Sequence, residues 1–210
     1  MRIVVSGTHA SGKSTLISDF GLAHPEYSRL DDPFDDLLDE GENAGPASFL
    51  AQLAISAERL AECRDVNLIA ERGPIDFLAY LMAWEELGRG TVDGGLLARA
   101  MDRTAAALQD VDLLVVLPVA DDISVPDEED PPLRSAMDEV LLRLVDDPEL
   151  VDPALLETVS GDPATRLRQI EHLVRDRAGE QEAPAEPPPT ASGAHRRRFS
   201  KPGDRDGPAA

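Results

Sequence analysis

The sequence predicts an α/β fold with a mostly parallel sheet of about five strands. Three short aliphatic runs, at residues 2–6, 66–70 and 112–117, each have the composition of a buried strand. Between them lie segments whose apolar residues recur at helical spacing, and this alternation is typical of parallel strands joined by right-handed helical crossovers. With 210 residues, 42% of them hydrophobic, the chain can form one domain of ordinary size.

The first half of the chain supplies a strand and two helices. Residues 2–6 contain the β-branched run 3–5 and are followed by Gly7, which indicates a buried strand followed by a turn. Residues 13–23 follow as a helix, because their apolar positions have helical spacing and Pro25 ends the segment. The acidic stretch 31–42 predicts a surface loop or a short irregular helix. Residues 47–63 form the next expected helix, with one apolar face.

The second half repeats the alternation of strands and helices. Pro74 is suited to the first turn of a helix that ends near Gly88, and another helix is expected at residues 95–108. The strand at 112–117 closes at Pro118. The remaining expected elements are a proline-rich acidic loop, a helix, a weaker strand and a last helix, at residues 120–132, 133–144, 155–159 and 163–177.

The C-terminal segment differs from the rest of the chain. Residues 178–210 contain many prolines and small residues and almost nothing to bury. Such a segment gains too little from burial to offset the entropy lost on ordering. We therefore expect a folded domain at residues 1–177 and a disordered, proline-rich tail at residues 178–210.

The charge of the chain restricts its partners. It has 20 basic and 41 acidic residues and a formal net charge of −21, which repels nucleic acid and anionic membranes. No apolar run approaches the roughly 18 residues needed to cross a bilayer, and the N-terminus opens on a strand rather than a signal sequence. We expect a cytoplasmic protein that binds small molecules, with no nucleic acid polymer and no membrane as a partner. The oligomeric state stays open, and a homodimer is compatible with the sequence.

A phosphate-binding motif follows the first strand. Residues 7–14 match the pattern G-x-x-x-x-G-K-S/T, and the expected helix follows directly. Its glycines let the backbone wrap around phosphate oxygens, while Lys13 reaches the β- and γ-phosphates and the Ser14 hydroxyl ligates Mg²⁺. The residues expected to bind nucleotide are Gly7, Thr8, His9, Ala10, Ser11, Gly12, Lys13, Ser14 and Thr15. The motif predicts a three-layer P-loop NTPase fold that binds a nucleoside triphosphate with Mg²⁺. We expect ATP, because the sequence lacks the guanine-reading motif Asn-Lys-x-Asp of GTPases.

A second group of polar residues follows the strand at residues 66–70. Glu71 and Arg72 stand at its C-terminal end, where ligands bind in open parallel sheets. If this strand neighbours the first, Glu71 can hold a Mg²⁺-bound water or accept the proton of an attacking hydroxyl, and Arg72 can clamp a substrate oxygen. The alternative is a surface ion pair at the end of a strand.

These segments resemble the P-loop kinases of the nucleoside and nucleotide kinase group. The likeness is greatest to thymidylate-kinase-like and nicotinamide-riboside-kinase-like proteins, often grouped as AAA-type ATP-binding proteins. It covers about residues 1–177. The residues that carry it are GTHASGKST at 7–15, ERGPIDFLAYL at 71–81, DLLVVLP at 112–118 and the region of Arg134.

The resemblance implies roles for several residues. It places Glu71 and Arg72 at the phosphoryl acceptor, where many relatives have Asp-Arg and deoxyribonucleoside kinases have the Glu-Arg found here. It also implies a helical lid at residues 120–134, with Arg134 contacting phosphate, although this lid is unusually acidic and has one arginine. Residues 160–167 are similar to the turn that borders the adenine ring, and a plain helix start explains them equally well. Gln52 occupies a place where such kinases read a base or ribose, with an exposed helix face as the alternative.

The sequence supports two hypotheses of function. The first is an ATP- and Mg²⁺-dependent kinase for a small metabolite, namely a nucleoside, a nucleotide or a pyridine riboside, with Lys13, Glu71, Arg72 and Arg134 as catalytic residues and Ser14 and Glu71 at the metal. The alternative is an ATP-binding regulatory switch or slow ATPase that acts on a protein partner. The single lid arginine favours the switch, and the segment ERGPID favours the kinase.

Overall fold

The computed structural model describes residues 1–33, 45–119 and 130–182. Within them, five strands form one sheet in the order β2-β3-β1-β4-β5, and each neighbouring pair is parallel. The predicted α/β fold with a parallel sheet of about five strands is confirmed. The strands are β1 (Arg2–Ser6), β2 (Ser28–Leu30), β3 (Leu68–Glu71), β4 (Leu113–Val116) and β5 (Leu156–Thr158).

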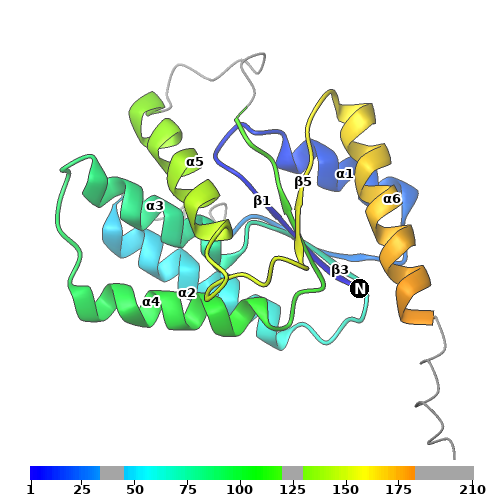
Figure 1. Ribbon diagram of the computed structural model, residues 1–210, viewed down its shortest axis with the longest axis horizontal. Coiled ribbons are helices and arrows are strands. Elements are labelled where there is room, and N and C mark those ends of the chain that lie inside the picture. The colour runs from blue at the N-terminus through cyan, green and yellow to red at the C-terminus, as the bar shows by residue number, and fades with distance from the viewer. Residues whose placement is uncertain (34–44, 120–129, 183–210) are drawn as a thin grey trace, which may run out of the picture.

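Helices cover both faces of the sheet and complete three layers (Figure 1). They are α1 (Lys13–Ala23), α2 (Pro46–Glu62), α3 (Pro74–Glu86), α4 (Gly94–Leu108), α5 (Pro131–Val145) and α6 (Pro163–Glu182). Helices α1 and α6 pack together on one face, whereas α2, α3, α4 and α5 form a connected layer on the other. The three-layer arrangement is the one that the phosphate-binding motif predicts.

The inner positions of the central strands are apolar because helices cover both faces of the sheet. On β1, Val4 packs with the layer of α2 to α5, whereas Ile3 and Val5 pack with α1 and α6. All three side chains are completely buried. Successive side chains of a strand point to opposite faces, so a strand between two helical layers needs apolar residues at every position.

The order of the strands brings the predicted polar residues to one edge of the sheet. β1 lies between β3 and β4, with Val5 opposite Glu71 and Ser6 opposite Val116. Because these strands are parallel, the loops that follow them meet at the same edge. β3, which ends at Glu71, is therefore a neighbour of β1, as the role expected for Glu71 requires.

Two strands differ from what the sequence predicts. β2 is not predicted by the sequence pattern, because it is a three-residue edge strand whose single apolar residue, Leu30, gives no alternation. β3 begins at Leu68 rather than at Val66, and Val66 is 78% exposed. An apolar residue at the start of a run does not show where pairing begins, because strand pairing is a long-range contact.

The last helix is longer than the sequence predicts. α6 continues to Glu182, so the expected tail begins as helix rather than as an irregular segment. The remainder of the expected tail, residues 183–210, lies outside the described residues, as do residues 120–129 of the expected lid and 34–44 of the acidic stretch.

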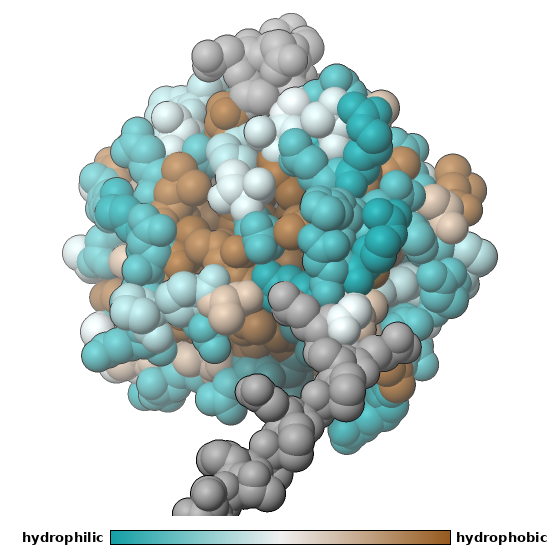
Figure 2. Space-filling model, turned by 45° about the vertical axis from the view of Figure 1, so that its right-hand side comes forward, coloured by the Kyte–Doolittle hydropathy of each residue, from teal (hydrophilic) through white to brown (hydrophobic). Residues whose placement is uncertain are grey.

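Polar residues cover much of the side of the molecule that carries α6, with apolar residues visible between them (Figure 2). Helix α6 buries Ile170 against the sheet and exposes Arg168 and Arg175. In the three described stretches, no helix combines the length and the apolar character needed to span a membrane.

Candidate active site

The loop between β1 and α1 depends on glycine at two positions. Gly7 has a φ of +153°, and a Cβ there would lie 2.7 Å from the Leu117 carbonyl oxygen and 2.8 Å from Ser11 Oγ. Gly12 caps α1 with a φ of +88°, in the left-handed region. Residues 9–15 line a cavity of about 910 Å³. The strand, glycine loop and helix required by the motif are therefore all present.

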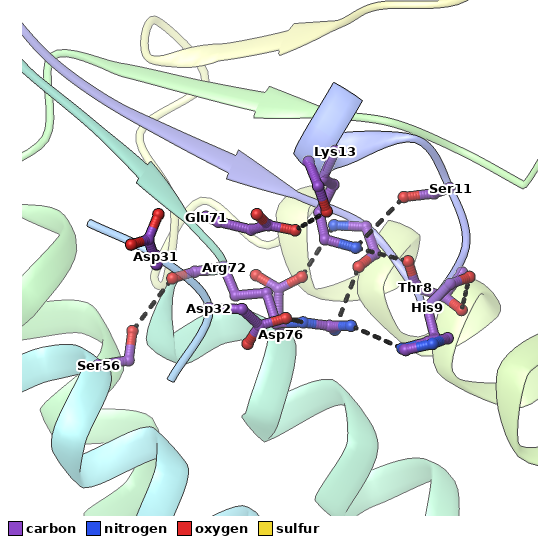
Figure 3. A network of polar contacts seen from close by, with 12 residues as sticks. Thr8, His9, Ser11, Lys13, Asp31, Asp32, Ser56, Glu71, Arg72 and Asp76 are labelled. Carbon is purple, nitrogen blue, oxygen red and sulfur yellow. Dashed lines mark hydrogen bonds and ion pairs between the residues drawn. The ribbon is translucent and has the colours of Figure 1, made fainter. Parts of the chain in front are cut away.

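Lys13 is folded back onto this loop. Its side chain is 3% exposed, and Nζ donates to the Thr8 carbonyl oxygen at 2.7 Å and to Ser11 Oγ at 3.4 Å (Figure 3). Burial, aided by the positive charge of Arg72, lowers the pKa of Lys13 to about 7, and the nearby carboxylates, Asp76 first among them, oppose this shift. The Lys13 side chain is thus held beside the loop, where burial makes its charged form costly until a negatively charged ligand is added.

Ser14 and Glu71 meet across the cavity. Ser14 Oγ donates to Glu71 Oε1 at 2.6 Å, which joins the first turn of α1 to the end of β3. Glu71 is 8% exposed, and both residues line the cavity. Mg²⁺ prefers oxygen ligands and keeps several waters or phosphate oxygens, so one hydroxyl and one carboxylate fit it. Over the described residues, no cluster of three or more His, Cys, Asp or Glu side chains is arranged to hold a metal.

Arg72 contacts Asp32 rather than Glu71. Its side chain is 4% exposed, and Nε donates to Asp32 Oδ2 at 2.6 Å. Its guanidinium also lies 3.5 Å from the Gly7 carbonyl oxygen and 3.4 Å from His9 Nδ1. The backbone of Arg72 has a φ of +61°, which is rare for a residue with a side chain and is often found at functional sites. The alternative that Glu71 and Arg72 form a surface ion pair is wrong, because both side chains are buried.

Asp76 supports the site and carries no assigned role in the sequence analysis. Its fully buried carboxylate accepts hydrogen bonds from Ser6 Oγ at 2.6 Å, from the Gly7 amide at 2.8 Å and from the Gly73 amide at 3.0 Å. Burial raises the pKa of Asp76, while the charges of Arg72 and Lys13 oppose the shift. The signal in the sequence is weak: Asp76 stands at the third position of α3, but the cap residue Gly73 lacks the side chain of a capping box.

An aromatic side chain from α3 also reaches the phosphate-binding loop. The backbone amide of His9 donates to the Tyr80 hydroxyl at 3.1 Å. Tyr80 stacks on Phe49 of α2 at a centroid distance of 5.3 Å, and the Arg72 guanidinium lies 5.6 Å from its ring centroid. Tyr80 belongs to the segment that carries the family resemblance, and no local pattern predicts this contact.

Arg134 lies in the first turns of α5 and reaches the loop from that side. Its Nε donates to the His9 carbonyl oxygen at 3.0 Å. The preceding Asp130 caps α5 through the Leu133 amide and forms an ion pair with Arg89, which holds the start of this helix. Arg134 is therefore brought to the loop between β1 and α1, where it contacts a backbone carbonyl group.

The other end of the cavity is built by β2, the end of β3 and α2. Its lining residues there are Arg29, Leu30, Asp31, Asp32, Arg59, Glu71 and Arg72. The Asp32 side chain is 13% exposed, and Arg59 donates to the Asp31 carbonyl oxygen at 3.2 Å. Asp32 stands in the stretch predicted to be an acidic surface loop, and only the structure places its carboxylate beside Arg72.

Gln52 lies inside the protein. It is 1% exposed, so the exposed helix face weighed for it from the sequence is wrong. Its Nε2 donates to Ser48 Oγ at 3.1 Å, whereas its Oε1 has no hydrogen-bond partner among the described residues. A buried amide oxygen of this kind is suited to a ligand or a water.

Comparison with known proteins identifies the fold. No family model and no curated protein sequence matches the chain. Among solved structures, deoxyadenosine kinase from M. mycoides with products dCMP and dCDP matches with a TM-score of 0.63 and 14% identity, over 84% of this chain and 100% of that chain. Thymidylate kinase from Candida albicans matches with a TM-score of 0.63 and 15% identity, over 84% of this chain and 91% of that one.

A third match is the NadR protein in complex with NR, with a TM-score of 0.62 and 15% identity. It covers 84% of this chain and 51% of that chain. The deoxyadenosine kinase and the thymidylate kinase belong to the class that the sequence motifs resemble. This chain therefore adopts the P-loop α/β fold of nucleoside and nucleotide kinases.

Proposed function

We propose that the protein transfers a phosphoryl group from ATP, in the presence of Mg²⁺, to a small metabolite of nucleoside, nucleotide or pyridine riboside type. The observation that carries the proposal is the hydrogen bond between Ser14 and Glu71 beside Lys13, at the cavity that continues to Asp32 and Arg72. Phosphoryl transfer needs a cradle for the donor and a place for the acceptor, and one cavity with two such ends supplies both.

At the donor end, the residues of the loop bind and neutralise the triphosphate. The amides of the loop and the N-terminus of α1 supply hydrogen-bond donors, and Lys13 supplies a positive charge. Ser14 and Glu71 would hold Mg²⁺, which when bound neutralises charge on the phosphate oxygens. The fold shared with nucleoside and nucleotide kinases supports this assignment.

At the acceptor end, Asp32 and Arg72 are the residues suited to the attacking group. Glu71 already contacts Ser14, so we assign it to the metal, and we assign the proton of the acceptor hydroxyl to Asp32. In the reaction, the acceptor oxygen bonds to the γ-phosphorus as the bond from phosphorus to the β–γ bridging oxygen breaks. ADP leaves, and where the acceptor is the hydroxyl of a nucleoside or riboside, its proton passes to the Asp32 carboxylate. The attacking phosphate oxygen of a nucleotide acceptor is already ionised and has no such proton to transfer. Arg72 orients the acceptor oxygen.

A switch or slow ATPase remains the second candidate. One observation favours it: Arg72 is bound by Asp32 and Arg134 contacts the His9 carbonyl oxygen, so both arginines to which the sequence assigns a catalytic role are engaged within the protein. In a switch, release of these contacts on nucleotide binding would be the signal, and water rather than a metabolite would accept the phosphoryl group.

A panel of acceptors tests the proposal. Purified protein is given ATP and Mg²⁺ with nucleosides, nucleoside monophosphates or pyridine ribosides, and ADP formation is measured. We expect one class to raise the rate at least about tenfold above the rate without acceptor, and Asp32→Asn to abolish this stimulation. Asp102→Asn, on an exposed position of α4, is the matched control and keeps it. Equal rates with and without every acceptor would reject the kinase and favour the switch.

A further inference from the structure

Arg166 is a buried cation behind the phosphate-binding loop, and neither the motif nor the proposed mechanism includes it. Its side chain is 6% exposed, although it lies in the first turns of α6. NH1 donates to the Ser11 carbonyl oxygen at 2.7 Å. Within the described part of the chain, no carboxylate forms an ion pair with Arg166, and its Nε has no hydrogen-bond partner. A guanidinium buried without a counter-charge is costly.

The turn before α6 fixes where Arg166 lies. Asp162 accepts hydrogen bonds from the Thr165 amide at 2.8 Å and from the Thr165 hydroxyl at 2.9 Å. The Arg166 amide donates to the Asp162 carbonyl oxygen at 2.9 Å, and Gly161 turns the chain with a φ of +99°. These contacts fix the start of α6, and with it the position from which the Arg166 side chain reaches the loop.

Arg166 approaches the loop closely at Gly12. A Cβ on Gly12 would lie 2.6 Å from NH1 of Arg166. The absence of a side chain at Gly12 therefore serves the arginine contact as well as the left-handed backbone. The two residues are 154 positions apart, and they form one unit at the start of α1.

The contact orients a peptide group. In a trans peptide, the carbonyl and the following N–H point in opposite directions, so a Ser11 carbonyl held by Arg166 turns the Gly12 N–H away from Arg166. Ser11 and Gly12 line the cavity at the loop. Loop amides that point into this cavity are the donors that cradle phosphates in the motif.

We propose that Arg166 is a positioning residue for polyphosphate: it holds the Ser11–Gly12 peptide so that its N–H faces the phosphates, and it places a positive charge behind them. The inference rests on the proposed function only in taking the loop as a phosphate site. A donor triphosphate would also supply the counter-charge that this guanidinium lacks among the described residues.

Binding of ATP and of inorganic tripolyphosphate by the full chain tests the inference. Both dissociation constants are measured by calorimetry for the wild type, Arg166→Met, Arg166→Lys and Arg168→Met. Arg168 is the matched control, because it lies on the exposed side of the same helix and its one hydrogen bond within the described residues is to Thr165. We expect Arg166→Met to weaken both ligands by the same factor, at least about tenfold, and Arg168→Met to change neither by more than about twofold.

Tripolyphosphate separates a role at the phosphates from a role at a base, because it has no base. Loss of ATP affinity alone would overturn the inference, and so would unchanged affinities in folded Arg166→Met, even if its melting temperature falls. Arg166→Lys keeps the charge and decides the case if Arg166→Met does not fold: a loss of affinity shared by both ligands, relative to the wild type, supports the inference, and wild-type affinities overturn it. Wild-type protein that binds both ligands without acceptor-stimulated turnover would reject the proposed kinase and leave this inference standing.

Discussion

Ser14 Oγ lies 2.6 Å from Glu71 Oε1, although the two residues are 57 positions apart in the sequence. The contact joins the end of the glycine loop to the end of β3. It places the Glu71 carboxylate where a metal bound to Ser14 would be, and it leaves Asp32 as the carboxylate beside Arg72. The roles of the two carboxylates can therefore be tested separately.

Glu71→Gln is expected to retain ATP binding and to lose most of the turnover. The amide keeps the size of the side chain and can still accept a hydrogen bond from Ser14, but it lacks the charge that holds a divalent cation. We predict a fall in turnover of at least about tenfold and an increased Mg²⁺ concentration for half-maximal activity.

Glu62→Gln is the control for this substitution, because Glu62 is exposed at the end of α2. It should leave both quantities unchanged. Turnover by Glu71→Gln equal to that of the wild type would remove Glu71 from the active site. An unchanged Mg²⁺ requirement with reduced turnover would instead assign Glu71 to the proton of the acceptor.

Lys13→Met is expected to abolish ATP binding and to stabilise the protein without ligand. The folded-state pKa of Lys13 is about 7, below its ordinary value of 10.5. The unfolded state therefore binds more protons between these two values, and stability rises with pH across this window. Burial of the charged ammonium costs stability in full below pH 7, and the cost disappears as the pH approaches 10.5.

Melting temperatures of the wild type and Lys13→Met between pH 6 and pH 10 measure this effect. The increase in melting temperature caused by Lys13→Met should be largest at the acid end of the range and should become steadily smaller as the pH rises. An increase that is independent of pH would show that Lys13 titrates at its ordinary value in the folded protein. Retained ATP binding by the folded variant would contradict the phosphate role of Lys13.

Asp76→Asn is expected to destabilise the protein and weaken ATP binding. Asp76 Oδ1 accepts from the Gly7 amide, and Oδ2 accepts from the Gly73 amide and Ser6. Whichever way the new amide is turned, its NH₂ faces a backbone N–H, which leaves a buried donor unsatisfied. We predict a loss of about 2 kcal/mol in the free energy of unfolding, measured by urea denaturation.

Asp93→Asn is the matched control, because Asp93 caps the exposed start of α4 and Asn is an equally good cap. Its stability should stay close to that of the wild type. An Asp76→Asn variant as stable as the control would mean that the carboxylate is already protonated in the folded state. Burial raises the pKa of Asp76, so a protonated Asp76 carboxyl group is the second outcome that this experiment distinguishes.

Arg134→Ala is expected to lower turnover more than ATP affinity. Arg134 reaches the His9 carbonyl oxygen from α5, so its guanidinium is close to the loop that would hold the transferred group. We predict a fall in turnover of at least about tenfold, which corresponds to roughly 1.4 kcal/mol of transition-state stabilisation. Steady-state rates and ATP titrations measure both quantities. Arg143→Ala, exposed on the same helix, should match the wild type in turnover, and a similar result for Arg134→Ala would favour the switch.

The sequence predicts the parts of the fold that local patterns determine. Aliphatic runs at β1 and β4 identify buried strands, and a motif of fixed spacing identifies the loop at residues 7–14. The edge strand β2 is different, because its three residues pair with β3 without any pattern of their own. The end of α6 is also not predicted, because the five residues beyond Arg177 are helical without any apolar periodicity.

The supporting contacts of the site depend on distance in three dimensions. Asp76 and Arg166 contact the loop from 69 and 155 positions away, and Asp32 contacts Arg72 from 40 positions away. Neither composition nor spacing connects these residues to the site. The sequence shows which residue types are present at each place. Only the order of the strands and the packing of α3 and α6 show which of them meet the loop.

The most direct test of the account is the stoichiometry of the products. With ATP, Mg²⁺ and the best acceptor of the panel, ADP, phosphorylated acceptor and inorganic phosphate are quantified over the same time course. The account predicts one phosphorylated acceptor for each ADP and little inorganic phosphate, with the transfer lost in Lys13→Met. ADP matched by inorganic phosphate, at the same rate with and without any acceptor, would contradict phosphoryl transfer to a metabolite.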